Sequence, residues 1–316
     1  MKRRRFFQYA GLGSVGFWLG TRDRAFASDP LPLDSQAKTA LETFEFTTAT
    51  VDRAGRVTQR QTHTAQFFPE RLNTVERLEM VAIAPGPFWM GASPTEAHAQ
   101  GQEFPRHRVK LSPFFISRHP ITQAQWAAVA SLPKVQRDLN PSPSHFQGDN
   151  HPIESISWLD AVEFCDRLSQ HTGRRYHLPS EAQWEYACRA GTQTPFNTGE
   201  TITAELADYL GAYTYKAEAA GEYCQSTLPV GRFTPNAFGL HDMHGNVWEW
   251  CSDSWRHNYR ETPTDNQIWI GVRQPQMRAI RGGGWLDAPA RIRSASRSGY
   301  LETALNRTIG LRVVAV

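Results

Sequence analysis

The hydrophobic positions along the chain predict few helices and many short strands. Polar residues dominate from 28 to 78, where the alternation Thr43-Phe44-Glu45-Phe46-Thr47 predicts an edge strand or two. From Met80 onward, short apolar runs are interrupted by glycine and proline, which is typical of short strands and long loops. We therefore expect one domain over residues 79–316 and an N-terminal extension over 28–78, which either docks on the domain or forms a flexible stalk.

Three segments carry the start signals of helices. Each begins with a hydroxyl residue that can cap the free backbone N–H groups of a first turn: Thr122, Ser157 and Ser180. Gln125 and Gln183, three residues after the first and the third of these, complete capping boxes. Gly173 and Gly191 predict the ends of the second and third helices. Beyond residue 191 the sequence predicts almost no helix.

The first 27 residues have the pattern of an export signal. A basic cluster, Lys2–Arg5, precedes the nearly uncharged run Phe6–Gly20 and the small-residue pattern Ala25-Phe26-Ala27. The arginines before Phe6 resemble a twin-arginine signal. An uncleaved membrane anchor is the alternative, although the apolar run is shorter than the roughly 20 residues that a spanning helix needs. We expect a mature protein in the periplasm or cell envelope without a stable transmembrane segment.

Composition narrows the class of protein further. The 316 residues include 20 prolines and 23 glycines, and 40% of them are hydrophobic, as in a globular protein rich in loops. The formal net charge of +3 comes from the signal, which holds six basic residues and one acidic residue and leaves 28 basic against 30 acidic residues. The mature chain therefore gives no argument for nucleic-acid binding.

The four cysteines, Cys165, Cys188, Cys224 and Cys251, would meet an oxidising compartment after export. One or two disulfides can form, and the spacing does not fix their pairing. No Cys-x-x-Cys pair occurs, so a structural zinc site is not expected. Cys165 and Cys188 lie on the apolar faces of predicted helices, and for both we favour a buried, inert thiol over a catalytic one.

Six short motifs follow one another along the chain: Met90–Ala92, Pro120–Trp126, Leu178–Ala187, Gly245–Trp250, Arg281–Trp285 and Ile309–Arg312. In these residues the chain resembles the formylglycine-generating enzyme, or sulfatase-modifying factor, family over roughly residues 78–316. The resemblance implies an α+β domain with the C-type-lectin-like fold of that family, which has few helices, short strands and many ordered loops.

The resemblance also implies calcium ions that tie the loops together. Two sets of ligands are implied, each with two side-chain carboxylates followed by two backbone carbonyls: Asp242, Glu249, Gly245 and Val247, and Asp208, Glu222, Tyr209 and Cys224. Calcium takes about six to eight oxygen ligands and accepts carboxylates and carbonyls alike. The alternative is that these acids form ordinary turn hydrogen bonds.

Copper is not expected. Active members of the family hold copper(I) with two thiolates just after the RGG(S)W motif, since soft thiolates suit this ion. Here Trp285 is followed by the sulfur-free segment Leu286–Arg293, and no cysteine follows Cys251.

The pocket that the resemblance implies departs from the family at further positions. Gly284 stands where the family has serine, and Thr308 stands where it has asparagine, whereas Trp248 is retained. We take Trp248, Gly284, Asp287 and Thr308 as the pocket candidates, with no catalytic residue assigned.

Two histidines offer an alternative metal arrangement. His241 and His244, with Asp242 and Glu249 nearby in sequence, form an HxxH pattern that could hold iron or zinc. Their spacing of three, in a stretch that reads as a loop, differs from the spacing of four that puts two histidines on one helical face.

Aromatic residues and arginines are dense in the last third of the chain, and both are usual anchors of recognition sites. They are Trp248, Trp250, Trp255, Tyr259, Trp269, Trp285 and Tyr300, with Arg256, Arg260, Arg291, Arg293 and Arg297. For any single tryptophan, a place in the core is the favoured interpretation. We therefore expect an exported, calcium-stabilised binding or accessory protein for an unidentified protein, peptide or glycan. The alternative is a divergent formylglycine-generating or related oxidase that acts on protein cysteine.

Overall fold

A computed structural model describes residues 40–271 and 276–316. The expected export signal, residues 1–27, lies outside these ranges. Residues from Ala40 onward form one compact unit, so the described part of the N-terminal extension belongs to the same unit as the rest. In the described ranges, none of the helices has both the length and the apolar character that a membrane crossing requires.

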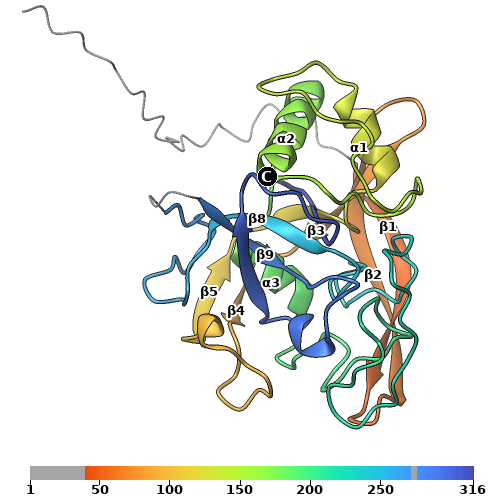
Figure 1. Cartoon of the computed structure of the whole chain (residues 1–316), viewed down its shortest axis with the longest axis vertical. Coiled ribbons are helices and arrows are strands. Elements are labelled where there is room, and N and C mark those ends of the chain that lie inside the picture. The colour runs from red at the N-terminus through yellow and green to blue at the C-terminus, as the bar shows by residue number, and fades with distance from the viewer. Residues whose placement is uncertain (1–39, 272–275) are drawn as a thin grey trace, which may run out of the picture. The chain divides into compact units, whose positions relative to one another are not determined.

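The larger sheet has six strands, and every neighbouring pair in it is antiparallel. In spatial order they are β1 (Glu42–Val51), β2 (Val57–Arg71), β3 (Arg77–Ile83), β6 (Phe114–Ser117), β12 (Val314–Ala315) and β7 (Tyr176–His177). The predicted edge strand is confirmed, because β1 lies at one edge of the sheet and forms with β2 the long hairpin in Figure 1. Its alternating Phe44 and Phe46 rings lie 5.3 Å apart, and Phe46 is buried.

A second sheet brings three of the sequence motifs together. Its spatial order is β10 (Arg297–Leu301), β9 (Met277–Arg281), β8 (Trp248–Ser254) and β11 (Ile309–Gly310). Glu249 pairs with Arg281 on one side of β8, and Trp248 pairs with Ile309 on the other. The loops before β8, after β9 and before β11 therefore meet at one end of this sheet. A separate hairpin joins β4 (Gly86–Met90) to β5 (His107–Leu111).

The three predicted helices are present as α1 (Gln123–Ala130), α2 (Trp158–Thr172) and α3 (Glu181–Arg189). Both predicted capping boxes form, and Ser157 makes a third with Asp160. Gly173 ends α2 in the left-handed conformation, as predicted. The end of α3 differs: Ala190, not Gly191, is its cap, with φ of 43°. Figure 1 shows α1 and α2 side by side and α3 near β4 and β9.

Among the buried arginines of this fold, four form ion pairs with glutamates that are distant in sequence. They are Arg281, Arg293, Arg297 and Arg312. Arg293 and Arg297 were expected on a recognition surface, and this expectation is wrong, because both are buried. Arg293 pairs with Glu103, and Arg297 pairs with Glu181, so both arginines join distant segments inside the protein. Charged groups at such depth need partners, because burying an isolated charge is very costly.

Candidate functional site

The four pocket candidates lie together where the loops flanking β8, β9 and β11 meet. The backbone N–H of Trp248 donates to the Thr308 carbonyl over 2.7 Å. The Trp248 indole N–H donates to Oδ2 of Asp287 over 2.7 Å, and the Gly284 N–H donates to the same oxygen over 3.0 Å. The Asp287 carboxylate therefore ties Trp248 to the loop that follows β9.

Gly284 is packed too tightly to carry a side chain without adjustment. A Cβ atom there would lie 3.3 Å from both the Cβ and the carbonyl oxygen of Thr308. The Thr308 hydroxyl is itself engaged, because it donates to Oδ1 of Asn306 over 2.8 Å. Asp287 and Thr308 both remain partly exposed.

Arg291 and Arg307 cover the two tryptophans of the site. The guanidinium carbon of Arg291 lies 5.2 Å from the centroid of the Trp248 ring, and that of Arg307 lies 5.4 Å from the Trp285 ring. Trp248 and Trp285 are consequently 4% and 3% exposed. The favoured interpretation of these tryptophans as buried residues is confirmed, and the surface of the site consists of arginine rather than indole.

Two further rings complete the surroundings of Trp285. Phe146 meets it edge to face at 5.3 Å, and Tyr223 lies nearly parallel to it at 6.3 Å between centroids. Sequence reasoning missed Phe146, Tyr223 and Arg307, because each comes from a different loop far from Trp285 in the chain. An aromatic in a loop has no periodic pattern that assigns it to a partner.

The thiols of the chain are all free and mostly buried. Cys165, Cys188 and Cys251 are buried, and Cys224 is partly buried. Burial raises the pKa of the Cys188 thiol to about 12 and raises those of Cys165 and Cys251 as well. The interpretation of Cys165 and Cys188 as inert core thiols agrees with this burial.

We predict that a thiol reagent such as DTNB modifies one cysteine per native chain, namely Cys224, and all four after unfolding. Desolvation leaves the other three thiols protonated and out of reach. A Cys224→Ala variant should lose the native reaction, whereas Cys188→Ala should keep it. Native modification of two or more thiols would refute this account of the core.

The first implied calcium set is only partly available. Both Glu249 oxygens are engaged, because Oε1 accepts from Nη2 of Arg312 at 3.0 Å and Oε2 accepts from the Trp184 indole N–H at 2.6 Å. Asp242 accepts from the Gly231 N–H through Oδ2, but its buried Oδ1 has no partner in the described structure.

Asp208, from the second set, lies within electrostatic reach of Asp242. Its buried Oδ2 also has no hydrogen-bond partner among the described residues. Desolvation, and then the charge of Asp242, raise the pKa of Asp208 to about 8, and desolvation raises that of Asp242 to about 6. The loops approach closely because Gly245 has φ of 81° and a Cβ there would lie 2.0 Å from the Asp208 carbonyl. A bound cation would stabilise these two buried carboxylate oxygens, which have no hydrogen-bond partner among the described residues.

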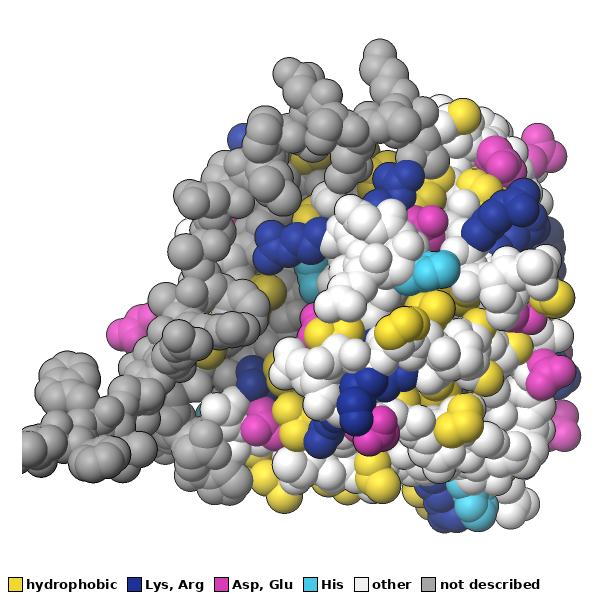
Figure 2. Space-filling model, turned by 90° about the horizontal axis from the view of Figure 1, so that it is seen from above, with side chains coloured by type: hydrophobic (Ala, Val, Ile, Leu, Met, Phe, Trp, Pro, Cys, Tyr) yellow, Lys and Arg dark blue, Asp and Glu magenta, His cyan; other side chains and the backbone are white. Residues whose placement is uncertain are grey.

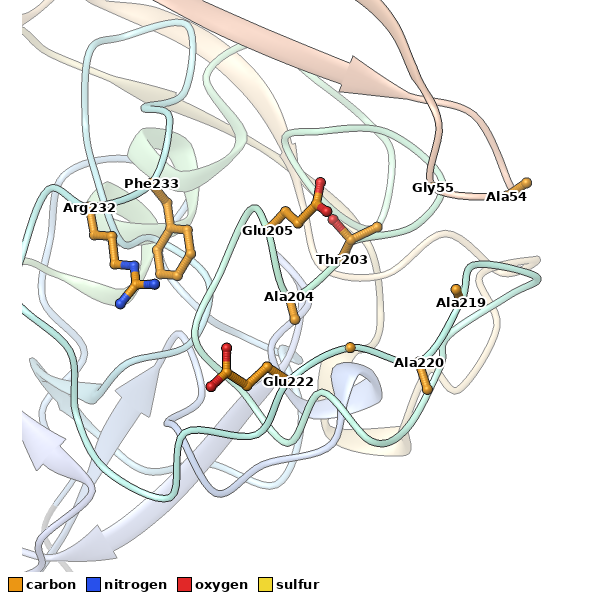
Figure 3. A pocket seen from close by; sticks show the side chains of 11 residues that line it. Ala54, Gly55, Thr203, Ala204, Glu205, Ala219, Ala220, Glu222, Arg232 and Phe233 are labelled. Atoms are coloured by element: carbon orange, nitrogen blue, oxygen red, sulfur yellow. The ribbon is translucent and has the colours of Figure 1, made fainter.

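The remaining members of the two sets are Glu222 and four expected backbone carbonyls. Among these carbonyls, that of Tyr209 already accepts from the Gly211 N–H over 2.7 Å. Glu222 is exposed and lines an open cavity of about 540 Å³. Figure 3 shows its walls, with Arg232 and Phe233 at one end and the β1–β2 turn at the other. In the described ranges no three His, Cys, Asp or Glu side chains converge as a metal site.

The two histidines of the HxxH pattern make separate structural hydrogen bonds. His241 bonds through Nδ1 to the Phe233 carbonyl, and His244 bonds through Nδ1 to the Ile292 carbonyl. Nε2 of His244 then accepts from the Asn197 N–H, so neither of its ring nitrogens is free. Desolvation lowers the pKa of each histidine to about 4. The structure therefore does not support iron or zinc ligation by this pair.

Charges on the visible face of the protein are mixed. Figure 2 shows basic, acidic and hydrophobic side chains interspersed over the part of this face that is not grey. No large area of one sign is visible there, so electrostatics on this face give no sign of a nucleic-acid partner.

Comparison with known proteins identifies relatives across most of the chain. Residues 65–316 match the family model described as "Sulfatase-modifying factor enzyme 1-like domain". The formylglycine-generating enzyme of Thermomonospora curvata is 29% identical over 255 residues, which cover 66% of this chain and 82% of that enzyme. The chaperone protein LppX of Paenibacillus barcinonensis is 28% identical over 250 residues, which cover 65% of this chain and 81% of that protein.

A solved structure, PvdO from Pseudomonas aeruginosa, superposes on this chain with a TM-score of 0.67 and 32% identity. The superposition covers 78% of this chain and 97% of PvdO. The expected α+β, C-type-lectin-like fold with few helices and many loops is thereby confirmed.

Proposed function

Because the chain belongs to the sulfatase-modifying factor family, in which formylglycine-generating enzymes are found, we propose that it is an exported binding or accessory member without copper oxidase activity. The basic, apolar and small-residue pattern of residues 1–27 supports export to the periplasm or cell envelope. The likeness to a protein named as a chaperone supports a role other than oxidation within this family.

One observation carries the proposal: the loop after Trp285 presents a carboxylate and a guanidinium instead of thiolates. Asp287 holds Trp248 by a hydrogen bond, and Arg291 lies over the same indole ring. Oxygen ligands of this kind suit hard cations, whereas copper(I) requires soft sulfur ligands. Three of the four thiols are buried elsewhere in the core. The residues of this loop therefore favour recognition of a ligand over oxidation of a thiol.

Calcium is proposed as a structural ion near Asp208 and Asp242. Their unpartnered, buried oxygens support this assignment, because a bound cation would offset the cost of desolvating two carboxylates. When bound, calcium would supply positive charge between loops that otherwise rely on backbone contacts. Glu249 is not proposed as a calcium ligand, because the Arg312 guanidinium already donates to both of its carboxylate oxygens.

Elemental analysis of the mature protein tests the proposal. After incubation with calcium and copper(I), followed by desalting, we expect bound calcium and no stoichiometric copper. An Asp208→Asn, Asp242→Asn double variant should lose the calcium, and a Glu205→Gln variant, at an exposed acid of the neighbouring cavity, should keep it. One copper ion retained per chain would contradict the binding-protein proposal and favour the oxidase alternative.

A further inference from the structure

We propose that Arg291 and Arg307 form a receptor for a small organic anion that has an apolar body. This inference rests on the proposed function, because it names the ligand class of the same site. Both guanidinium groups lie over buried indole rings, and the segments that carry these rings are joined by the hydrogen bond from the Trp285 N–H to the Asn246 carbonyl. Each is therefore held in place by the ring beneath it, and Arg291 remains partly exposed and Arg307 exposed.

Arg307 supplies an uncompensated charge. In the described ranges no acidic side chain forms a salt bridge with it, and its guanidinium makes no hydrogen bond. Its backbone carbonyl accepts from the Trp285 indole N–H over 3.3 Å, which fixes the base of the side chain beside the ring that its head covers. A planar guanidinium placed in this way can donate two parallel hydrogen bonds to one oxyanion.

Arg291 retains most of its donors as well. Its nearest acid is Asp287, whose Oδ1 lies 3.8 Å from Nε of Arg291, beyond hydrogen-bond distance. The other oxygen of Asp287 is already taken by Trp248 and Gly284. Asp287 thus attracts the Arg291 guanidinium but accepts no hydrogen bond from it. Partly exposed ion pairs of this kind are weak and leave the guanidinium able to bind a second anion.

Exposed leucines flank both arginines. Leu286, next to Trp285, is 47% exposed, and Leu305, two residues before Arg307, is 64% exposed. Single exposed leucines need no explanation, but here two of them stand on the same loops as two unsatisfied guanidinium groups. This combination suits a ligand with a carboxylate or phosphate at one end and an aliphatic or aromatic body at the other.

Isothermal titration calorimetry with octanoate, octyl phosphate and uncharged octanamide tests the inference. We expect millimolar or tighter binding of at least one of the two anions and none of octanamide. The anion that binds more tightly identifies the carboxylate or the phosphate as the natural group. Arg307→Gln and Arg291→Gln should each weaken binding roughly tenfold, because each removes one charge-assisted contact.

Two further variants distinguish guanidinium recognition from simple charge. Arg307→Lys keeps the charge but loses the planar fork, so it should weaken binding nearly as much as Arg307→Gln. Arg60→Gln, at an exposed position on β2, should leave binding unchanged. Absence of binding for both anions, equal binding of octanamide, or equal loss with Arg60→Gln would overturn the inference. None of these outcomes would affect the copper test, so failure of the anion site and failure of the proposed function are distinguishable.

Discussion

Replacing Arg312 with methionine is expected to destabilise the protein by about 3–5 kcal/mol. Arg312 and Glu249 are both buried, and the guanidinium donates to the two carboxylate oxygens and to the carbonyls of Ser117 and His241. Removing the arginine leaves the Glu249 charge inside the core with only the Trp184 indole as a hydrogen-bond donor. Urea denaturation followed by circular dichroism measures the change.

Two variants serve as controls for this result. Arg77→Met breaks an exposed pair with Glu79 and should cost no more than about 1 kcal/mol. Adding Glu249→Leu to Arg312→Met should recover part of the loss, because the unpaired charge is then gone. If Arg312→Met were as mild as Arg77→Met, Glu249 would have to be held by another group, and its assignment to Arg312 would be wrong.

The second large effect concerns Asp208 and Asp242, each of which has a buried carboxylate oxygen without a hydrogen-bond partner among the described residues. We compare the free energy of unfolding of the wild-type protein with that of an Asp208→Asn, Asp242→Asn variant, with a chelator present to remove calcium. The wild-type value should fall relative to that of the variant as pH rises from about 4 to about 8. The pKa of each acid is raised in the folded state, to about 8 for Asp208 and about 6 for Asp242. Between the unfolded pKa near 3.9 and these values, the folded state binds more protons than the unfolded state, so stability declines as pH increases.

The size of this relative decline should be about 2–5 kcal/mol, measured by urea denaturation at each pH. Calcium should restore most of it at pH 8 and little at pH 4, because a bound ion competes with protons for the same oxygens. His119, His241 and His244 have pKa values lowered to about 4, which removes stability as pH falls below about 6.5. That contribution is common to both proteins and drops out of the comparison. A pH-independent difference would contradict the environment described for Asp208.

Local signals in the sequence were sufficient for the parts of the fold that depend on neighbouring residues. The caps at Thr122, Ser157 and Ser180 predicted where helices begin, because a hydroxyl must satisfy the free N–H groups of a first turn. The end of α3 at Ala190 was missed, since alanine rarely adopts positive φ and gave no signal.

The candidate site could be predicted only in part. Its motifs named Trp248, Gly284, Asp287 and Thr308, which do meet in space. The residues that complete the site, Arg307 above all, approach through loops whose paths depend on long-range contacts. Burial of Arg293 was not predictable either, because its partner Glu103 is 190 residues away in sequence.

We propose that this member of the family does not oxidise thiols with copper. The most direct test incubates the purified mature protein with copper(I), oxygen and a peptide containing cysteine, and follows the peptide mass and oxygen consumption over time. We expect an unchanged peptide thiol and no oxygen uptake above a control without protein. Copper-dependent conversion of that cysteine, abolished when Cys224 is replaced by alanine, would contradict it and place the oxidase chemistry on a thiol outside the Trp285 loop.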